Sequence, residues 1–209
     1  ELMQKGDSIY YGLNPTTNNL IMANRKELDN GSGWLLAKPG SGKSFATKRE
    51  IVQVILNTND DVVIIDPEKE YELLTGRYSG SYINVSTTSG VYFNPFDGDD
   101  TDVNFLSEKA EFLQSMMAHI MCVDNLTPQY VSIIDRTLRE LWASYESKKN
   151  NNKDVSVPRP TLDDFANLLA EQKEKEAESL ALALGIYTKN GTYNLFSKPS
   201  NINMNNRLI

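Results

Sequence analysis

The chain has 209 residues, of which 40% are hydrophobic and 23% charged, and its formal net charge at pH 7 is −7. This length suits one α/β domain with a sizeable core, or a compact domain that carries an inserted subdomain. The composition is that of a folded globular protein, and no apolar run in the sequence is long enough to span a membrane. The negative charge argues against a surface coated with nucleic acid, although a local basic groove stays compatible with it.

The single cysteine, the single histidine and the first four residues allow three further expectations. The lone cysteine, Cys122, excludes an internal disulfide and is compatible with a reducing compartment. Cys122 and the lone histidine, His119, fall in an apolar helical stretch, so we expect a core cysteine and a buried or half-exposed structural histidine. Residues 1–4 do not resemble a natural start, and we expect the chain to be part of a longer protein.

The first half of the chain has the pattern of a strand, a loop, a helix and a second strand. Short β-type runs at residues 8–11 and 19–22 predict edge strands or a segment that wraps around the domain. Residues 34–37 are a short apolar run that predicts a strand, and residues 43–57 carry apolar side chains at helical spacing. Residues 62–65 are a continuous β-branched run, which is typical of an interior parallel strand. Together these segments predict a βαβ unit.

A P-loop sequence lies between the first of these strands and the helix: Ala37-Lys38-Pro39-Gly40-Ser41-Gly42-Lys43-Ser44. Glycines let such a loop curl so that its backbone N–H groups point inward, and the helix adds the positive end of its dipole. The loop therefore predicts a cradle for the phosphates of a nucleoside triphosphate, with a plain glycine turn as the alternative. Lys43 would bridge the β- and γ-phosphates, and the Ser44 hydroxyl would ligate Mg²⁺. The predicted nucleotide-binding residues are Lys38, Pro39, Gly40, Ser41, Gly42, Lys43, Ser44 and Phe45.

A P-loop ATPase also needs an acidic residue at the end of a second strand, and Asp66 follows the run at residues 62–65. A glutamate that polarises the attacking water usually comes next, but here Pro67 does, and the nearest carboxylates are Glu68 and Glu70. The equally weighted alternative is that Asp66 caps the strand and Pro67 begins a turn. We predict the catalytic residues Lys43, Asp66 and Glu70, and the magnesium ligands Ser44 and Asp66.

The second half of the chain has the pattern of a helical block. Two more β-rich runs, residues 81–85 and 91–93, lead into a turn at residues 94–98. Four helices are expected after it: one capped by Ser107, one that begins at Thr127 and Pro128, one with an acidic capping box at residues 161–164, and one from Glu178 to about Leu184. We expect a polar loop at residues 148–159 and a solvated helix face at residues 171–176, with docking of a partner as the alternative for the second segment.

Four segments together resemble the ATPases of type IV secretion and conjugation systems, the CagE/TrbE/VirB family. They are Leu36-Ala37-Lys38-Pro39-Gly40-Ser41-Gly42-Lys43-Ser44-Phe45, Lys48-Arg49-Glu50-Ile51, Ile64-Ile65-Asp66-Pro67-Glu68-Lys69-Glu70-Tyr71 and Phe93-Asn94-Pro95-Phe96. Residues 191–196 and 201–208 are similar to the segment that leads, in this family, into the strand before its second acidic motif. The resemblance covers nearly the whole chain.

The resemblance implies an α/β P-loop NTPase of the RecA-like type, with a largely parallel sheet and an inserted all-α subdomain. We accordingly predict a nucleotide-binding core over residues 1–104, a helical insertion over residues 105–186 and a return to the core over residues 187–209. An incomplete motor domain is also implied, because the family's Asp-Glu motif, glutamine motif and arginine finger would lie beyond Ile209. Residues 207–209 have the pattern of a strand that is just beginning.

The function that the resemblance implies is an ATPase that uses ATP and Mg²⁺ to power conjugative transfer or type IV secretion. Its implied partners are copies of itself in a homo-hexamer and other subunits of the secretion complex, at the cytoplasmic face of the bacterial inner membrane. Two alternatives stay open: a DNA-pumping translocase of the FtsK/HerA class, and a non-hydrolytic, nucleotide-gated assembly module. The weakly basic loop with Lys148, Lys149 and Lys153 predicts plain surface rather than DNA contact.

Overall fold

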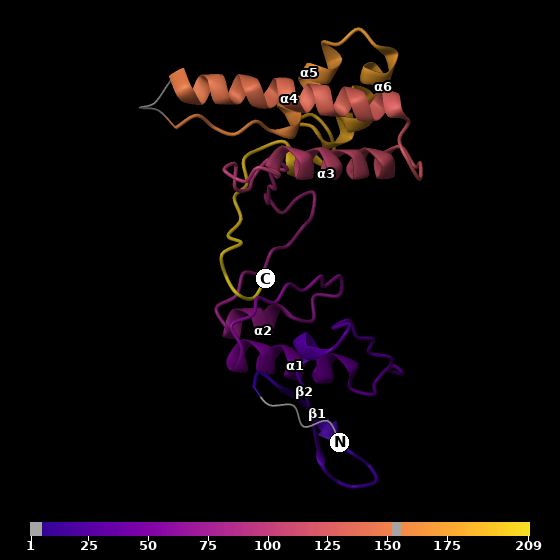
Figure 1. Cartoon of the computed structure of the whole chain (residues 1–209), viewed down its shortest axis with the longest axis vertical. Helices are drawn as coiled ribbons and strands as arrows, with labels where there is room; N and C mark the ends of the chain where they lie inside the picture. Colours follow the sequence, from indigo (N-terminus) through magenta and orange to yellow (C-terminus); the bar gives the residue numbers. More distant parts are fainter. Residues whose placement is uncertain (1–5, 152–155) are drawn as a thin grey trace. The chain divides into compact units, whose positions relative to one another are not determined.

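The computed structural model describes residues 6–151 and 156–209, which belong to two compact units (Figure 1). One unit comprises the chain up to Ile83 together with Asn203–Ile209, and we call it the α/β unit. The other comprises Asn84–Ile202, and we call it the helical unit. The α/β unit therefore combines two segments that are distant in the sequence, whereas the helical unit is one continuous segment. The predicted division of the chain at residues 104 and 186 stays a prediction.

A β-hairpin opens the α/β unit. Strands β1 (Ile9–Leu13) and β2 (Leu20–Ala23) pair antiparallel, which confirms the two strands expected here, and the register shifts between Tyr10 and Gly12. A short 3-10 turn, η1 (Arg25–Glu27), follows β2, and its N-cap Asn24 accepts a hydrogen bond from the Lys26 backbone N–H. Two helices complete the regular elements of this unit: α1 (Lys43–Asn57), as predicted, and α2 (Glu72–Arg77).

Three extended segments meet around Leu208, whose side chain is buried. Val62 and Leu208 form a parallel bridge, in which the Val62 N–H donates to the Arg207 carbonyl over 2.7 Å and the Ile64 N–H donates to the Ile209 carbonyl over 2.8 Å. On the other side, the Ser81 N–H donates to the Leu208 carbonyl over 2.8 Å. The pairing is parallel, as expected for residues 62–65. It is short, however, so the largely parallel sheet stays a prediction.

The strand predicted at residues 34–37 was wrong for the described part of the chain. These residues have no assigned strand, and the side chains of Trp34 and Leu36 are 91% and 88% exposed. A strand needs a neighbour that satisfies its backbone groups, and no described segment pairs with this one. Residues 81–85 and 91–93 are likewise irregular, although the Phe93 N–H donates to the Leu195 carbonyl over 2.9 Å.

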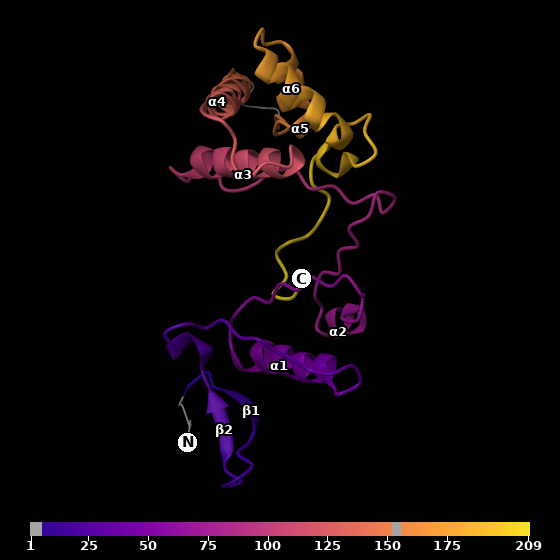
Figure 2. The same cartoon turned by 90° about the vertical axis from the view of Figure 1, so that its right-hand side faces the viewer.

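The helical unit packs four helices around one apolar core. They are α3 (Phe105–Ile120), α4 (Pro128–Asn151), α5 (Leu162–Ala170) and α6 (Lys175–Leu184), followed by 3-10 turns at Gly185–Tyr187 and Asn194–Phe196. Figure 2 shows α4 end-on and α3 lengthwise, so these two helices cross. Side chains from all four helices and from the segment before α3 are fully buried: Phe96, Leu113, Met117, Ile134, Leu138, Leu162, Phe165, Leu169, Leu180 and Leu184.

Several helix ends differ from the predictions. Helix α4 begins at Pro128 as expected, and the capping box of Thr161 and Asp164 is present at the start of α5. Helix α3 begins at Phe105, before the predicted cap Ser107, and α6 begins at Lys175 rather than Glu178. Helix α4 continues to Asn151, so the polar loop expected from residue 148 was wrong over its first four residues. Residues 152–155 lie outside the described residues.

The charged run at residues 171–176 is not a solvated helix face. Its first four residues, 171–174, form the turn between α5 and α6, and this turn is bonded to α4. The Gln172 side-chain amide donates to the Thr137 hydroxyl over 2.5 Å, and Glu174 forms an ion pair with Arg136 over 2.7 Å. Thr137 is buried, and its hydroxyl donates in turn to the Ile133 carbonyl over 2.7 Å. The polar residues of the run therefore fix the turn on α4.

The Asn-Pro-Phe segment of the family-like motif lies in the helical unit, where Asn94 is 6% exposed. The Asn94 side-chain amide donates to the Pro160 carbonyl over 3.0 Å, and its oxygen accepts from the Phe96 N–H over 3.1 Å. The Arg159 guanidinium donates to the Phe96 carbonyl over 3.1 Å and lies 3.4 Å from Asp100. The turn before α3 is thus tied to the segment before α5.

The expectation of a core cysteine was wrong, because α3 ends at Ile120 and Cys122 lies exposed in the turn after it, with a left-handed φ of 55°. His119, in the last turn of α3, is exposed, which excludes a buried position for its side chain. Among the described residues, no group of three or more His, Cys, Asp or Glu side chains could hold a metal ion. No helix among them has the length and apolar character that crossing a membrane requires.

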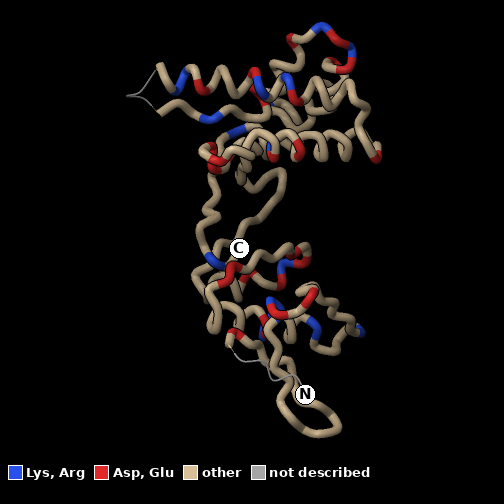
Figure 3. Tube along the Cα trace, in the orientation of Figure 1, with Lys and Arg blue, Asp and Glu red and all other residues tan. Residues whose placement is uncertain are grey.

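Charges of both signs are interleaved along α4, as Figure 3 shows. Lys149 forms an ion pair with Asp100 over 2.9 Å, while Lys153 lies outside the described residues. A protein that binds the phosphate backbone of DNA usually gathers its Lys and Arg on one face. The pairing of Lys149 supports the expectation of plain surface, and DNA contact stays untested.

Candidate nucleotide-binding site

The P-loop is a sharp turn that leads directly into α1. The Ser41 N–H and hydroxyl both donate to the Lys38 carbonyl, over 3.1 and 2.6 Å. Gly40 and Gly42 have φ angles of 77° and 89°, in the left-handed region that side chains with a Cβ rarely adopt. A Cβ at either position would meet nothing within 4 Å. The two glycines are therefore needed for the backbone turn, and the space inside the loop stays open.

The N-terminus of α1 provides the donors of the site. Gly42 is its N-cap, no side chain caps this end, and the first turn has no acidic residue. The first hydrogen bond of the helix runs from the Ala46 N–H to the Gly42 carbonyl over 2.9 Å. The backbone N–H groups before Ala46 have no partner inside a helix, and they lie at the positive end of the helix dipole. Such an end is suited to bind an anion.

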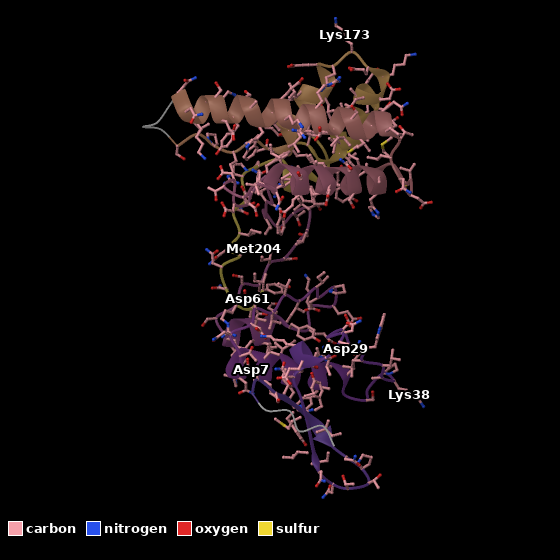
Figure 4. All side chains as sticks on the ribbon, viewed as in Figure 1. Asp7, Asp29, Lys38, Asp61, Lys173 and Met204 are labelled. Carbon is pink, nitrogen blue, oxygen red and sulfur yellow. The ribbon has the colours of Figure 1, made fainter. Side chains whose placement is uncertain are left out.

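The predicted nucleotide-binding residues surround this helix end and are accessible. Residues 38–43 are exposed, Ser44 is half-buried, and the Phe45 side chain is 76% exposed. Lys38 projects from the loop in Figure 4, away from the rest of the α/β unit. The structure therefore brings together the eight residues of the prediction on one accessible turn. Their binding roles stay predictions.

Asp66 is engaged by its own loop. Its carboxylate accepts a hydrogen bond from the Tyr71 N–H over 2.9 Å. Desolvation raises the pKa of Asp66, but hydrogen bonds from the backbone N–H groups of residues 68–71 outweigh it and hold the pKa below its usual value. This geometry is the turn-capping arrangement that the sequence left open as an alternative. It keeps the carboxylate ionised, and an ionised carboxylate is also what a metal ligand requires.

The loop that Asp66 caps lies against the helix of the P-loop. The Lys48 ammonium of α1 lies 5.3 Å from the centre of the Tyr71 ring, within the range of a cation–π contact. Lys48 is five residues beyond Lys43 on α1, so the contact ties the Asp66 loop to the first half of this helix. Glu68 and Glu70 of the same loop are exposed. The predicted role of Glu70 is not tested by these contacts.

Two groups of contacts that the motifs do not indicate fix α1 in place. The Gln53 side chain bonds to both backbone groups of Tyr10, accepting from its N–H over 2.9 Å and donating to its carbonyl over 3.3 Å. At the other end of α1, the Arg207 guanidinium donates to the carbonyls of Ile55, Thr58 and Asp60, over 3.3, 2.7 and 2.9 Å. A cation there complements the negative end of the helix dipole.

These anchors join residues that are far apart in the sequence. Gln53 and Tyr10 are 43 positions apart, and Arg207 and Ile55 are 152 positions apart. Hydrophobic periodicity is recognised within short windows of sequence, so it gives no indication of which distant residues contact each other. The sequence therefore contained no sign of Gln53 and Arg207, the residues that hold the P-loop helix in place.

The family assignment follows from comparison with known proteins. A model of the TraG P-loop domain matches residues 14–208, which is nearly the whole chain. The chain belongs to the TraG P-loop domain family. No curated protein matches it significantly.

A solved structure agrees with this assignment. The structure of VirB4 of Thermoanaerobacter pseudethanolicus superposes on this member of the TraG P-loop domain family with a TM-score of 0.75, at 21% sequence identity. The match covers 100% of this chain and 57% of that one, so the chain spans little more than half the length of the VirB4 chain. At this identity the match establishes the fold, which is of the P-loop NTPase type. The two findings confirm the resemblance to type IV secretion and conjugation ATPases.

Proposed function

We propose that this chain binds Mg·ATP on the P-loop and that the protein uses ATP hydrolysis to power conjugative transfer or type IV secretion. The observation that supports this most is the uncapped N-terminus of α1, which follows two left-handed glycines in a chain of the TraG P-loop domain family. Successive free N–H groups, a lysine and a hydroxyl at one accessible turn are what a triphosphate requires.

Each side chain has a distinct role in this proposal. The backbone N–H groups of residues 42–45 bind the phosphate oxygens, and the Lys43 ammonium neutralises the charge that develops on the β- and γ-phosphates. Glu70 accepts a proton from the attacking water, whose oxygen forms the new bond to the γ-phosphorus as the bond to ADP breaks. The exposed carboxylate of Glu70, on the loop that contacts Lys48 of α1, is compatible with this role.

Magnesium fits the oxygen donors that are present. Mg²⁺ prefers oxygen ligands and is usually held by one or two protein groups together with substrate phosphates and water. The Ser44 hydroxyl and the Asp66 carboxylate would hold it here, and the ion would supply charge neutralisation between the β- and γ-phosphates. The lowered pKa of Asp66 supports this assignment, since that carboxylate is ionised at neutral pH.

The assembly and the place of action belong to the same proposal. The family and the VirB4-like fold favour a motor that works as a homo-hexamer with other subunits of a type IV secretion complex, at the cytoplasmic face of the inner membrane. A DNA-pumping motor is less favoured, because the net charge is −7 and the charges on α4 are mixed in sign.

The proposal is tested by measuring Mg·ATP binding calorimetrically for three proteins: the chain itself, Lys43→Ala and Lys173→Ala. Lys173 is an exposed lysine that projects from the helical unit in Figure 4, so its variant is a matched control for the loss of one positive charge. We expect Lys43→Ala to lose measurable binding while its circular dichroism is unchanged, because one phosphate-binding charge is removed from an exposed position. Lys173→Ala should bind like the parent chain.

Equal affinity of Lys43→Ala and the parent chain would remove Lys43 from the site. Absence of binding by the parent chain would overturn the proposed function altogether. Strong stimulation of ATP turnover by DNA in the full-length protein, lost at high salt, would favour the DNA-pumping alternative instead.

A further inference from the structure

Arg25, in the 3-10 turn after the hairpin, contacts three parts of the α/β unit. Its guanidinium donates from Nε to the Tyr11 hydroxyl of β1 over 2.8 Å. It also forms an ion pair with Glu50 of α1, with 2.6 Å between Nη2 and Oε1. The Tyr11 hydroxyl donates to the same Glu50 oxygen over 2.9 Å, so the three side chains form a closed triangle. We call these three residues the Arg25 triad.

The third part is the segment that enters the P-loop. A Cβ at Gly33 would lie 3.3 Å from the Arg25 Nη2 atom, and a Cβ at Gly31 would lie 3.2 Å from the Arg25 carbonyl oxygen. Both distances are tighter than ordinary contacts of a Cβ, and neither glycine has a left-handed φ. A side chain at either position would therefore crowd Arg25, although the backbone conformation itself would permit one.

The triad is partly shielded from water. The side chains of Arg25 and Glu50 are 42% and 29% exposed, and the Arg25 guanidinium lies 5.7 Å from the centre of the Tyr11 ring. Burial raises the pKa of Tyr11, so its hydroxyl keeps the proton that it donates to Glu50. Contacts around Tyr10 reinforce the arrangement, since Arg49 of α1 lies over its ring at 5.2 Å and donates to the Tyr11 carbonyl over 3.1 Å.

We propose that Arg25 is a positioning residue for the P-loop, because it holds the segment that enters the loop at a fixed place relative to the helix that leaves it. The backbone N–H groups of a P-loop converge on a phosphate only when the two ends of the loop are held at a fixed position relative to each other. The loop itself has few internal bonds, and residues 34–43 are exposed. The Arg25 guanidinium lies close to Gly33 on the entering side and is paired with Glu50 on the leaving side, so it can hold the two ends of the loop at a fixed separation. This role rests on the proposed nucleotide binding.

The first test compares Arg25→Met with Lys26→Met in the whole chain. Lys26 is the next residue of the same 3-10 turn and forms an ion pair with Asp60 over 2.5 Å, so its variant removes a similar pair that has no contact with Gly31 or Gly33. We expect Mg·ATP to bind Arg25→Met on the order of tenfold more weakly, the effect typical of residues that orient a binding site from behind. Lys26→Met should change the affinity less than twofold.

A second test separates positioning from general stability. Gly33→Ala should weaken Mg·ATP binding in the parent chain, because the new methyl group displaces the guanidinium. In the Arg25→Ala background the same change should have little effect, since the guanidinium that the methyl group would displace is absent. Such non-additive effects on the binding free energy indicate that residues 25 and 33 interact directly. Equal effects of Gly33→Ala in both backgrounds would overturn the proposal, as would Arg25→Met binding like the parent chain.

A third measurement does not depend on nucleotide. Hydrogen exchange of the nucleotide-free chain should show faster exchange over α1 in Arg25→Met than in Lys26→Met, because the helix loses its link to the entering segment. If the parent chain failed to bind Mg·ATP, the proposed function would fall, and the exchange comparison would still decide whether Arg25 positions α1. Equal exchange in the two variants would refute the positioning role.

Discussion

Replacing Asn94 with alanine removes two hydrogen bonds from the interior of the helical unit. The Asn94 amide donates to the buried Pro160 carbonyl, and its oxygen accepts from the N–H of Phe96, whose side chain is fully buried. A buried polar group left without its partner costs roughly 1–3 kcal/mol. We therefore expect Asn94→Ala to lower the free energy of unfolding of this unit by about 2–4 kcal/mol, allowing for partial rehydration of the two groups.

The chain offers a specific probe for this measurement. Trp142 is 4% exposed in the core of the helical unit, and Trp34, the other tryptophan, is 91% exposed. In a Trp34→Phe background, urea unfolding followed by tryptophan fluorescence therefore reports the helical unit. Asn190→Ala, at an exposed asparagine of the same unit, is the matched control. A difference below about 0.5 kcal/mol between Asn94→Ala and this control would refute the reasoning, because exposed substitutions commonly have effects of that size.

Three further outcomes are expected. The hydrogen bond from Lys149 and the charge of Arg159 lower the pKa of Asp100 despite its desolvation, so Asp100 stabilises the fold above its unfolded pKa of about 3.9. That contribution is lost as the pH falls through the lowered pKa of Asp100 in the folded chain. The free energy of unfolding in urea should therefore fall less steeply with decreasing pH in Asp100→Asn than in the parent chain. An unchanged pH profile would contradict this role of Asp100. Thr137→Val should cost about 1 kcal/mol in the same fluorescence assay, because the Gln172 amide loses its acceptor; an unchanged urea midpoint would show that this bond is replaced by water. The chain should bind Mg·ATP but release phosphate slowly, since no apolar run in it ends in Asp-Glu, and turnover at the rate of a working motor would show that a described carboxylate suffices.

The features that the sequence predicted correctly are those with local causes. The start of α1 follows from the glycines of the P-loop, and the start of α5 follows from a capping box that Thr161 and Asp164 complete within four residues. The beginning of α4 follows in the same way from proline at its first position. In each case the physical reason is contained in a few neighbouring residues, so a short window of sequence is enough.

The features that were missed depend on distant partners. The apolar run at residues 34–37 has strand character, but pairing is decided by another segment, and none of the described ones supplies it. Residues 171–174 have the composition of an exposed face, yet they dock on α4 through Gln172 and Glu174. At the site, the phosphate-binding loop was evident from the sequence, while Arg25 and Arg207, which brace its helix, carry no motif.

The hydrogen bonds between Gln53 and the backbone of Tyr10 protect an edge strand from pairing with another molecule. An edge strand offers free N–H and C=O groups that can pair with a strand of another molecule and so begin aggregation. On β1 the two backbone groups of Tyr10 are already occupied by the Gln53 amide, which bonds to them as a neighbouring strand would. One glutamine on α1 therefore closes the Tyr10 position of β1 against intermolecular pairing, and its replacement by leucine would open that position to self-association.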